Sequence, residues 1–396
     1  MSSVRQAFAI TATNLRNVPL RLGSSLVIVI GIAGVVGVLI PVLAMSIGFR
    51  STMLGDARPE RAVVLSRAAT EEDTSSVSRE DFAKIMNAPE VRRDTRGRPI
   101  VSGEVLQQAP VARKGDHSDV SVALRGVGEQ YFALRPELKL VAGRMYQSGK
   151  LELVVGAAAL AQFEGVAIGD SIRLQDGDWI VVGTYAGSNG SRESEIISDA
   201  QTVMSVYKLN SFNSVTVALN DAASFASFRQ EVVRDTKSLA DAQSEPEYLA
   251  SASGWMSRML HIVAYSVGGI MALGALFGAL NSMYSVVAAR AAEMATLRAI
   301  GFSALAVAVA VLTEALLLAL LGAAIGVGIS YALFDGSTIS TLGGAVSNSQ
   351  VVFALSITPT LAIGVALLAC ALGLAGGLVP AIRAARSNIA DTLHET

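Results

Sequence analysis

Charged residues are scarce in this chain of 396 residues: they make up only 16%, whereas hydrophobic residues make up 52%. A soluble domain usually contains about 25% charged residues, so this composition indicates a membrane protein. The net charge is −2, so the chain has no excess of positive charge that would indicate nucleic-acid binding. Cys370 is the single cysteine, which excludes intramolecular disulfides and cysteine-rich metal sites.

Motifs of nucleotide-binding and hydrolytic enzymes are also missing. The nearest approach to a P-loop begins at Gly143, but it has one residue too many between its glycines and ends on Leu151, where a hydroxyl residue must hold magnesium. No zinc motif and no GxSxG motif occurs, and the three histidines are far apart: His117, His261 and His394. We therefore expect no enzymatic site and no cofactor in this chain.

Four long apolar runs are present, and a run of about 18 or more residues predicts a membrane-spanning helix. We assign the spans to residues 22–49, 259–289, 302–334 and 351–382. The first run is longer than the core of a cleavable signal peptide, which spans about 7–15 residues. We therefore interpret it as an uncleaved helix.

The orientation follows from Lys and Arg near the span ends, because these residues favour the cytoplasmic side. Three arginines lie within residues 1–21, and the others are Arg290, Arg298, Arg383 and Arg386. The loop 335–350 has neither Lys nor Arg. We therefore expect both termini, including the tail 383–396, in the cytoplasm. Arginines alternate with apolar residues in 1–21, which favours an interfacial helix over a simple charged anchor.

Residues 50–258 predict a soluble α+β domain with two lobes, placed outside the membrane between the first and second spans. Ser78 followed by Asp81 is typical of a helix start, and apolar stripes follow it at Phe82 and also begin at Phe225. Short β-like runs lie at residues 120–124, 151–155, 171–174, 179–182 and 215–219. The polar residues 187–195 predict an exposed loop. The fold class is thus membrane α-helical, with four transmembrane helices and a large α+β extracytoplasmic domain.

Residues 290–301 form a short segment between the second and third spans. They begin with charge, continue with good helix formers and end at Gly301. A helix in this position is too short to bury its apolar residues in a core of its own. We expect it to dock onto another protein.

Two further features lie inside the spans. Glu314 is the one acid there, and an ionisable residue in a span is a functional candidate by default; we favour a structural or coupling role over ion transport. Small-residue pairs at GxxxG spacing predict close helix packing, within one protomer or at a dimer seam. They are Gly274 with Gly278, Gly322 with Gly326, and Gly373 with Gly377. No charged lining predicts a solute pathway through the membrane.

The segment Arg290-x-x-Glu293-x-x-x-Leu297-Arg298-Ala299-Ile300-Gly301 is similar to the coupling-helix signature of permease subunits in the MacB/FtsX family of ABC transporters. Met294-Ala295 stands where Ile-Gly is usual. The outer domain also resembles the family's periplasmic core at residues 125–132, 143–144, 153–156, 169–172 and 180–183. The likeness covers nearly the whole chain.

This resemblance implies a permease dimer, formed with a second copy or a paralogue, above two separate ATPase subunits that bind ATP and Mg. The coupling helix would enter a cleft of the ATPase, with apolar contact from Met294, Leu297 and Ile300 and orientation from Glu293 and Arg298. The spans would carry the motion to the outer domain, so that substrate is exported by mechanotransmission. In Gram-negative relatives the outer domain docks a periplasmic adaptor that leads to an outer-membrane channel.

Other functions stay open at this point. A lipoprotein-releasing subunit is disfavoured because the outer domain has no long, exposed apolar hook. An FtsX-like regulator of a cell-wall hydrolase is disfavoured because the outer domain is large and contains several Gly-Asp turns. A membrane-anchored sensor gives no reason for the docking helix. A membrane-bound enzyme ranks last, because no catalytic constellation is present.

Overall fold

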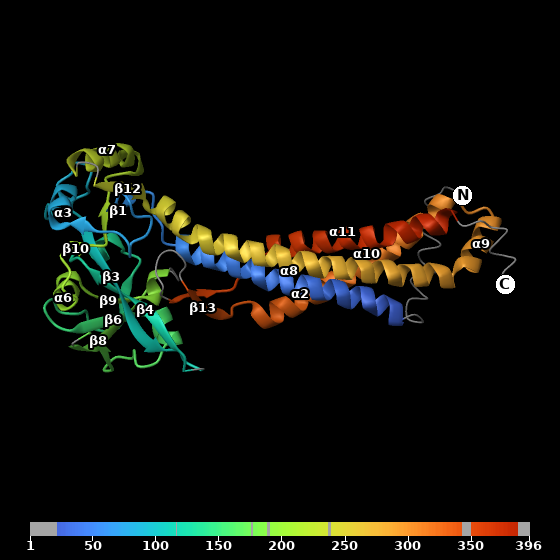
Figure 1. Ribbon diagram of the computed structural model, residues 1–396, viewed down its shortest axis with the longest axis horizontal. Coiled ribbons are helices and arrows are strands. Elements are labelled where there is room, and N and C mark those ends of the chain that lie inside the picture. The colour runs from blue at the N-terminus through green and yellow to red at the C-terminus, as the bar shows by residue number, and fades with distance from the viewer. Residues whose placement is uncertain are drawn as a thin grey trace. The chain divides into compact units, whose positions relative to one another are not determined.

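The computed structural model describes residues 22–115, 117–175, 177–187, 191–236, 239–342 and 350–386 (Figure 1). The chain divides into two compact units. We call residues up to Ser46, Leu260–Ser337 and those from Leu355 the membrane unit, and Ile47–Met259 with Thr338–Ala354 the sheet unit. The predicted interfacial helix at 1–21 and most of the predicted tail lie outside the described residues.

Four helices of the described chain are long and apolar enough to cross a membrane: α2 (Leu22–Leu54), α8 (Glu245–Ala289), α10 (Ala304–Phe334) and α11 (Pro359–Arg386). The short helix α9 (Ala291–Ala299) separates α8 from α10. With 45 residues, α8 is roughly 68 Å long at 1.5 Å per residue. A bilayer core is only about 30 Å thick, so much of α8 is available outside the membrane.

The sheet unit is built on one ten-stranded sheet with strand order β12-β1-β11-β3-β4-β9-β6-β8-β5, in which β7 also pairs with β8. Its strands are β1 (Arg61–Ser66), β3 (Val101–Ala112), β4 (Asp119–Val127), β5 (Lys139–Gly143), β6 (Glu152–Gly156), β7 (Ser171–Leu174), β8 (Gly177–Ala186), β9 (Ile196–Asp199), β11 (Ser214–Ala218) and β12 (Ala240–Ser244). The smaller elements are β2 (Val77–Ser78), β10 (Ser211–Phe212), α3 (Arg79–Met86), α4 (Tyr131–Leu134), α5 (Ala157–Gln162), η2 (Ser191–Ser194), α6 (Ala200–Val206), η3 (Ala222–Ser224) and α7 (Phe225–Asp235).

Strand β3 joins two lobes of the sheet unit. Its first part, from Val101 to Glu104, pairs with β11, whereas its second part, from Val105, pairs with β4. Each part covers a separate hydrophobic core: one includes Phe228 of α7, and the other includes Trp179 of β8. Figure 1 shows α3 and α7 beside the first lobe and α6 beside the second.

Several local predictions are confirmed by the structure. Ser78 caps α3, because its side-chain oxygen accepts a hydrogen bond from the backbone N–H of Asp81 at 3.0 Å. The stripe that begins at Phe225 lies on α7. The β-like runs at 120–124, 171–174 and 179–182 fall within β4, β7 and β8. Each of these signals depends on residues that are close in sequence.

The predicted boundary at residues 350 and 351 is wrong. The predicted loop and the start of the predicted fourth span form a hairpin of β13 (Thr338–Leu342) and β14 (Gln350–Ala354), and helix α11 begins only at Pro359. Thr358 caps α11 by accepting a hydrogen bond from the N–H of Leu361 at 3.3 Å. The apolar residues of β14 resemble a span in composition, but three of the four are β-branched or aromatic, and they precede a proline that favours a helix start. The second predicted span, residues 259–289, lies within α8, and the residues of α8 before Leu260 belong to the sheet unit.

The hairpin packs within the sheet unit. The backbone N–H of Val352 donates to the side-chain oxygen of Ser194 at 2.9 Å, and Phe353 packs edge-to-face on Phe49 with ring centroids 5.6 Å apart. Ser194 lies in the segment 187–195 that was predicted to be an exposed loop. That prediction is wrong for the residues from Arg192 onward, which are buried.

Candidate functional site

Helix α9 ends in a sharp turn that leads into α10. At its end Gly301 adopts a φ of +103°, which favours glycine, and the N–H of Phe302 donates to the carbonyl of Leu297 at 3.1 Å. Ser303 then caps α10 by accepting from the N–H of Ala306 at 3.2 Å. The orientation of α9 on α10 is therefore set by the backbone of this loop as well as by side chains.

Glu314, the acid predicted inside the third span, lies against an arginine. Arg290 places Nη1 3.6 Å from Glu314 Oε2 and Nε 3.1 Å from Glu293 Oε2. The side chains of Arg290 and Glu314 are both largely buried, whereas that of Glu293 is 57% exposed. The arginine thus joins an acid inside α10 to an acid on the outer face of α9. The coupling role of Glu314 stays a prediction.

A small cavity lies beside this ion pair, lined by residues of α8, α9 and α10 that include Met294 and Val311. Its volume is about 20 Å³, which is room for about one water molecule and not for a transported solute. The arrangement serves to hold α9 on the membrane unit, and it offers no passage.

The two faces of α9 differ in exposure. Met294 and Ala295 are buried in the core of the membrane unit, and Leu297 packs partly against the same core. Ile300 is 72% exposed. The side chain of Met294 thus anchors α9 to its own chain, and its contact with another subunit stays a prediction. Ile300 and Glu293 form the face that is open to another protein, and Arg298 is half-buried beside it.

Two of the three predicted glycine pairs pack against other helices of the same chain, and the third pair is largely open. A Cβ on Gly326 would lie 2.7 Å from Val36 of α2, and Gly322 faces the same helix. A Cβ on Gly377 would lie 2.8 Å from that of Ala315 in α10, and Gly373 also faces α10. These two pairs pack one protomer. Gly278 makes only an ordinary contact with α2, and Gly274 has no neighbour within 4 Å.

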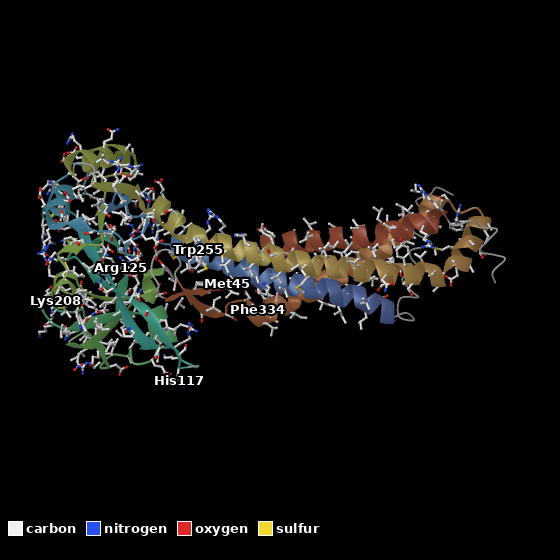
Figure 2. All side chains as sticks on the ribbon, viewed as in Figure 1. Met45, His117, Arg125, Lys208, Trp255 and Phe334 are labelled. Atoms are coloured by element: carbon white, nitrogen blue, oxygen red, sulfur yellow. The ribbon has the colours of Figure 1, made fainter. Side chains whose placement is uncertain are left out.

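A buried charge cluster in the sheet unit was not predicted from any sequence pattern. Arg125 lies among the strands of this unit (Figure 2) and pairs with three carboxylates at 2.7–2.8 Å: Glu72, Glu104 and Glu195. Burial alone would raise the pKa of Glu72, but the charges of Arg125 and Arg192 outweigh it and lower the pKa to about 2. The partners come from distant parts of the chain, so no local motif marks them.

A cleft of about 1010 Å³ opens between the two lobes of the sheet unit. Phe82 and Phe212 provide an aromatic part of its wall, with ring centroids 4.9 Å apart, and Asp199 and Arg98 provide charge. A volume of this size is in the range of ligand sites in proteins. Among the residues that the structure describes, no group of three or more His, Cys, Asp or Glu is placed to hold a metal ion.

These features define a polytopic membrane protein with a short helix between its second and third spans and a two-lobed α/β domain. The MacB-like periplasmic core domain matches residues 24–235, and the FtsX-like permease C-terminal domain matches residues 265–389. The chain therefore belongs to the MacB/FtsX family of ABC transporter permeases. Permeases of this family work with an ATPase partner.

Relatives with known sequences and structures agree with this family. The macrolide export ATP-binding/permease protein MacB of Neisseria gonorrhoeae is 26% identical over 303 residues, which are 70% of this chain and 44% of that protein. MacB of Neisseria meningitidis gives the same identity and coverage. The chain thus spans less than half the length of the curated relatives it matches.

Two solved structures of outer domains are also similar to this chain. The periplasmic region of MacB from Actinobacillus actinomycetemcomitans has 15% identity and a TM-score of 0.38, and covers 48% of this chain and 92% of its own. The extracellular domain of the transporter YknZ from Gram-positive bacteria has 15% identity and a TM-score of 0.36, and covers 46% of this chain and 99% of its own.

Proposed function

We propose that this chain is the permease subunit of a MacB-type ABC transporter in the bacterial inner membrane, and that it exports a substrate by mechanotransmission. A separate ATPase subunit binds ATP and Mg, and this chain contributes no catalytic group. Two permeases, identical or paralogous, form the working dimer. The termini and α9 face the cytoplasm, and the sheet unit faces the periplasm.

The two-sided character of α9 carries this proposal. One side is held by Met294 in the membrane core and by the Arg290–Glu314 contact, so a push on α9 reaches α10 directly. The other side presents Ile300 and Glu293, an apolar group beside an acid, to a partner. A helix that is anchored on one side and exposed on the other transmits force between two proteins.

The substrate is handled outside the membrane in this mechanism. The cavity beside α9 is too small for a solute, and a cleft of substrate size lies in the sheet unit instead. Movement of the sheet unit would then drive export, and an adaptor with an outer-membrane channel would complete the path in a Gram-negative cell. Lipoprotein release and regulation of a cell-wall hydrolase use the same type of permease and are the alternatives within the family.

Capture of the ATPase tests the proposal. The purified permease in detergent is mixed with the ATPase encoded beside its gene, and wild type is compared with Glu293→Ala/Ile300→Asp. We expect the variant to lose about tenfold or more in affinity, because an exposed apolar anchor at the centre of an interface is typically worth at least about 1–2 kcal/mol.

Leu239→Asp is the matched control, because Leu239 is 66% exposed and lies in the sheet unit. It should capture the ATPase as well as wild type does. If wild type captures no ATPase, the transporter proposal fails and a membrane-anchored sensor becomes the better interpretation. If the double variant binds as tightly as wild type, the docking surface on α9 is wrong.

A further inference from the structure

A single buried carboxylate lies where two spanning helices enter the sheet unit. Glu245 is the first residue of α8, and its side chain is 1% exposed. Its Oε2 accepts from Arg61 Nε at 2.6 Å and from the backbone N–H of Arg58 at 3.0 Å, and its Oε1 accepts from Arg135 Nη1 at 2.7 Å. Both oxygens are therefore bonded to buried donors.

The donors come from two parts of the sheet unit. Arg58 and Arg61 follow the end of α2 and lead into β1, whereas Arg135 follows α4. Arg61 also donates to the carbonyl of Asp56, and Nη1 donates to Glu137 at 2.7 Å and to the carbonyl of Leu134 at 2.9 Å. The chain leaving α2, the start of α8 and the segment after α4 thus meet at one cluster.

Buried charge pairs of this kind are rigid because any displacement leaves a desolvated charge without a partner. Burial would raise the pKa of Glu245, but the charges of Arg135 and Arg61 outweigh it and hold the pKa below its ordinary value. The cluster therefore remains charged at neutral pH. An apolar contact at the same place would let the two helix ends slide on each other.

We propose that Glu245 is a positioning residue that locks the sheet-unit ends of α2 and α8 together, so that both helices turn the sheet unit as one lever. This inference rests on the proposed transport function, since it names the joint through which force from α9 would reach the sheet unit. Helix α8 is suited to this task because it runs unbroken from Glu245 to Ala289, beside α9.

The rigidity of the joint can be measured without ATP. Spin labels are placed at Ala250 on α8 and Gln108 on β3, two exposed positions of the sheet unit, in the full chain with Cys370→Ala. Wild type should give one narrow distance distribution by double electron–electron resonance. Glu245→Gln, which keeps the size of the side chain and removes its charge, should lose that single narrow peak.

The role in coupling is measured with labels at Gln108 in both copies of the permease, assembled with the ATPase in nanodiscs. Wild type should change this distance when ATP is added. Glu245→Gln should lose the change and still capture the ATPase, since α9 is untouched. Arg229→Gln is the matched control, because it breaks the exposed ion pair with Asp241 in the same unit and should leave both distances as in wild type.

A second variant separates positioning from simple stabilisation. Glu245→Gln leaves Arg135 unpaired, whereas Arg61 keeps Glu137, so Glu245→Gln/Arg135→Gln removes the uncompensated charge. The double variant should regain the melting temperature of wild type but still show no distance change when ATP is added.

Two outcomes would overturn the proposal. In one, the double variant regains both its stability and the distance change on addition of ATP. In the other, Glu245→Gln keeps the single narrow peak of wild type. If Glu245→Gln does not fold, the double variant and Glu245→Asp carry the same comparison. An unresponsive wild type defeats the transport function alone, because the Ala250–Gln108 distance still tests the joint.

Discussion

The two units of this protein use buried arginine in different ways. In the sheet unit Arg125 is surrounded by three carboxylates at 2.7–2.8 Å, and all four side chains are buried or nearly so. In the membrane unit Arg290 reaches Glu314 only at 3.6 Å and shares its charge with Glu293, which is largely exposed. Arg125 is thus fully enclosed by its partners, whereas Glu293, one of the partners of Arg290, can be replaced by water or by a group of another protein.

This difference separates a rigid body from an adjustable contact. A closed network in a low-dielectric interior is costly to open, because every displaced group loses several partners at once. A long ion pair beside a small cavity can shorten, lengthen or exchange partners at little cost. The charge network of the sheet unit is therefore rigid, whereas α9 is held by Met294 and by an ion pair that is less tightly enclosed.

The largest expected effect is in the sheet unit. Arg125→Met leaves three buried carboxylates without their countercharge, and breaking a buried pair on one side typically costs about 3–5 kcal/mol. This is a large part of the roughly 5–15 kcal/mol that stabilises a folded domain. We expect the melting temperature to fall by about 10 °C or more. Fluorescence of the buried Trp179 in a Trp255→Phe background reports the transition.

Arg229→Met is the control for this measurement. Its ion pair with Asp241 is exposed, and such pairs contribute about 0–1 kcal/mol. A similar loss of stability in both variants would mean that the Arg125 cluster is not distinguished by burial, and the contrast between the two units would fail.

Acid should act on the same cluster with a smaller effect. The pKa of Glu72 is lowered from 4.5 to about 2, so its contribution to stability is complete above pH 4.5 and is lost as the pH falls from 4.5 through about 2. The contribution is on the order of 3 kcal/mol. Glu72→Gln should flatten the dependence of the Trp179 transition on pH in this window. An equally steep dependence in the variant would assign the acid sensitivity to other groups.

The contrast between the units also explains what the sequence could predict. The spans, the docking segment and the Ser78 cap each depend on residues within about one or two helical turns, and these signals are readable along the chain. The partners of Arg125 are separated by long stretches, so only the folded sheet brings them together. Nothing local distinguishes a buried glutamate from an exposed one.

The wrong predictions have the same origin. Residues 187–195 are polar and were assigned to the surface, but Arg192 is buried because its charge is matched within the fold. Residues 351–354 are apolar, which predicts a membrane span, but they lie in strand β14 of the hairpin in the sheet unit. The type of a residue predicts whether it prefers to be buried, but only the folded structure shows where in the protein it is buried.

In the membrane unit, close packing of small residues replaces charge. Gly377→Ala would force a Cβ to within 2.8 Å of Ala315, and overpacking of this kind typically costs about 1–3 kcal/mol. Gly274→Ala is the matched variant, since no atom lies within 4 Å of its new Cβ. Unfolding of the full chain in mixed micelles should show a loss of stability for the first variant only. A loss for Gly274→Ala that depends on protein concentration would place this glycine in a dimer seam.

The smallest expected effect concerns the hairpin between α10 and α11. Ser194→Ala removes the acceptor of the Val352 N–H, and the loss of one such hydrogen bond is worth about 1 kcal/mol. Hydrogen exchange at residues 350–354 should be roughly fivefold faster, whereas the strands near Arg125 should keep their protection.

Ser227→Ala is the control, because the Ser227 hydroxyl donates to a carbonyl at an exposed position. Faster exchange throughout the sheet unit in Ser194→Ala would show that the hairpin is part of the rigid body and not a separate attachment to it. Faster exchange limited to the hairpin would instead make it an independent contact, held by one serine and by the packing of Phe353 on Phe49. In that case the segment between α10 and α11 could detach while the charge cluster stays closed, and Glu245 would remain the firm joint of the sheet unit.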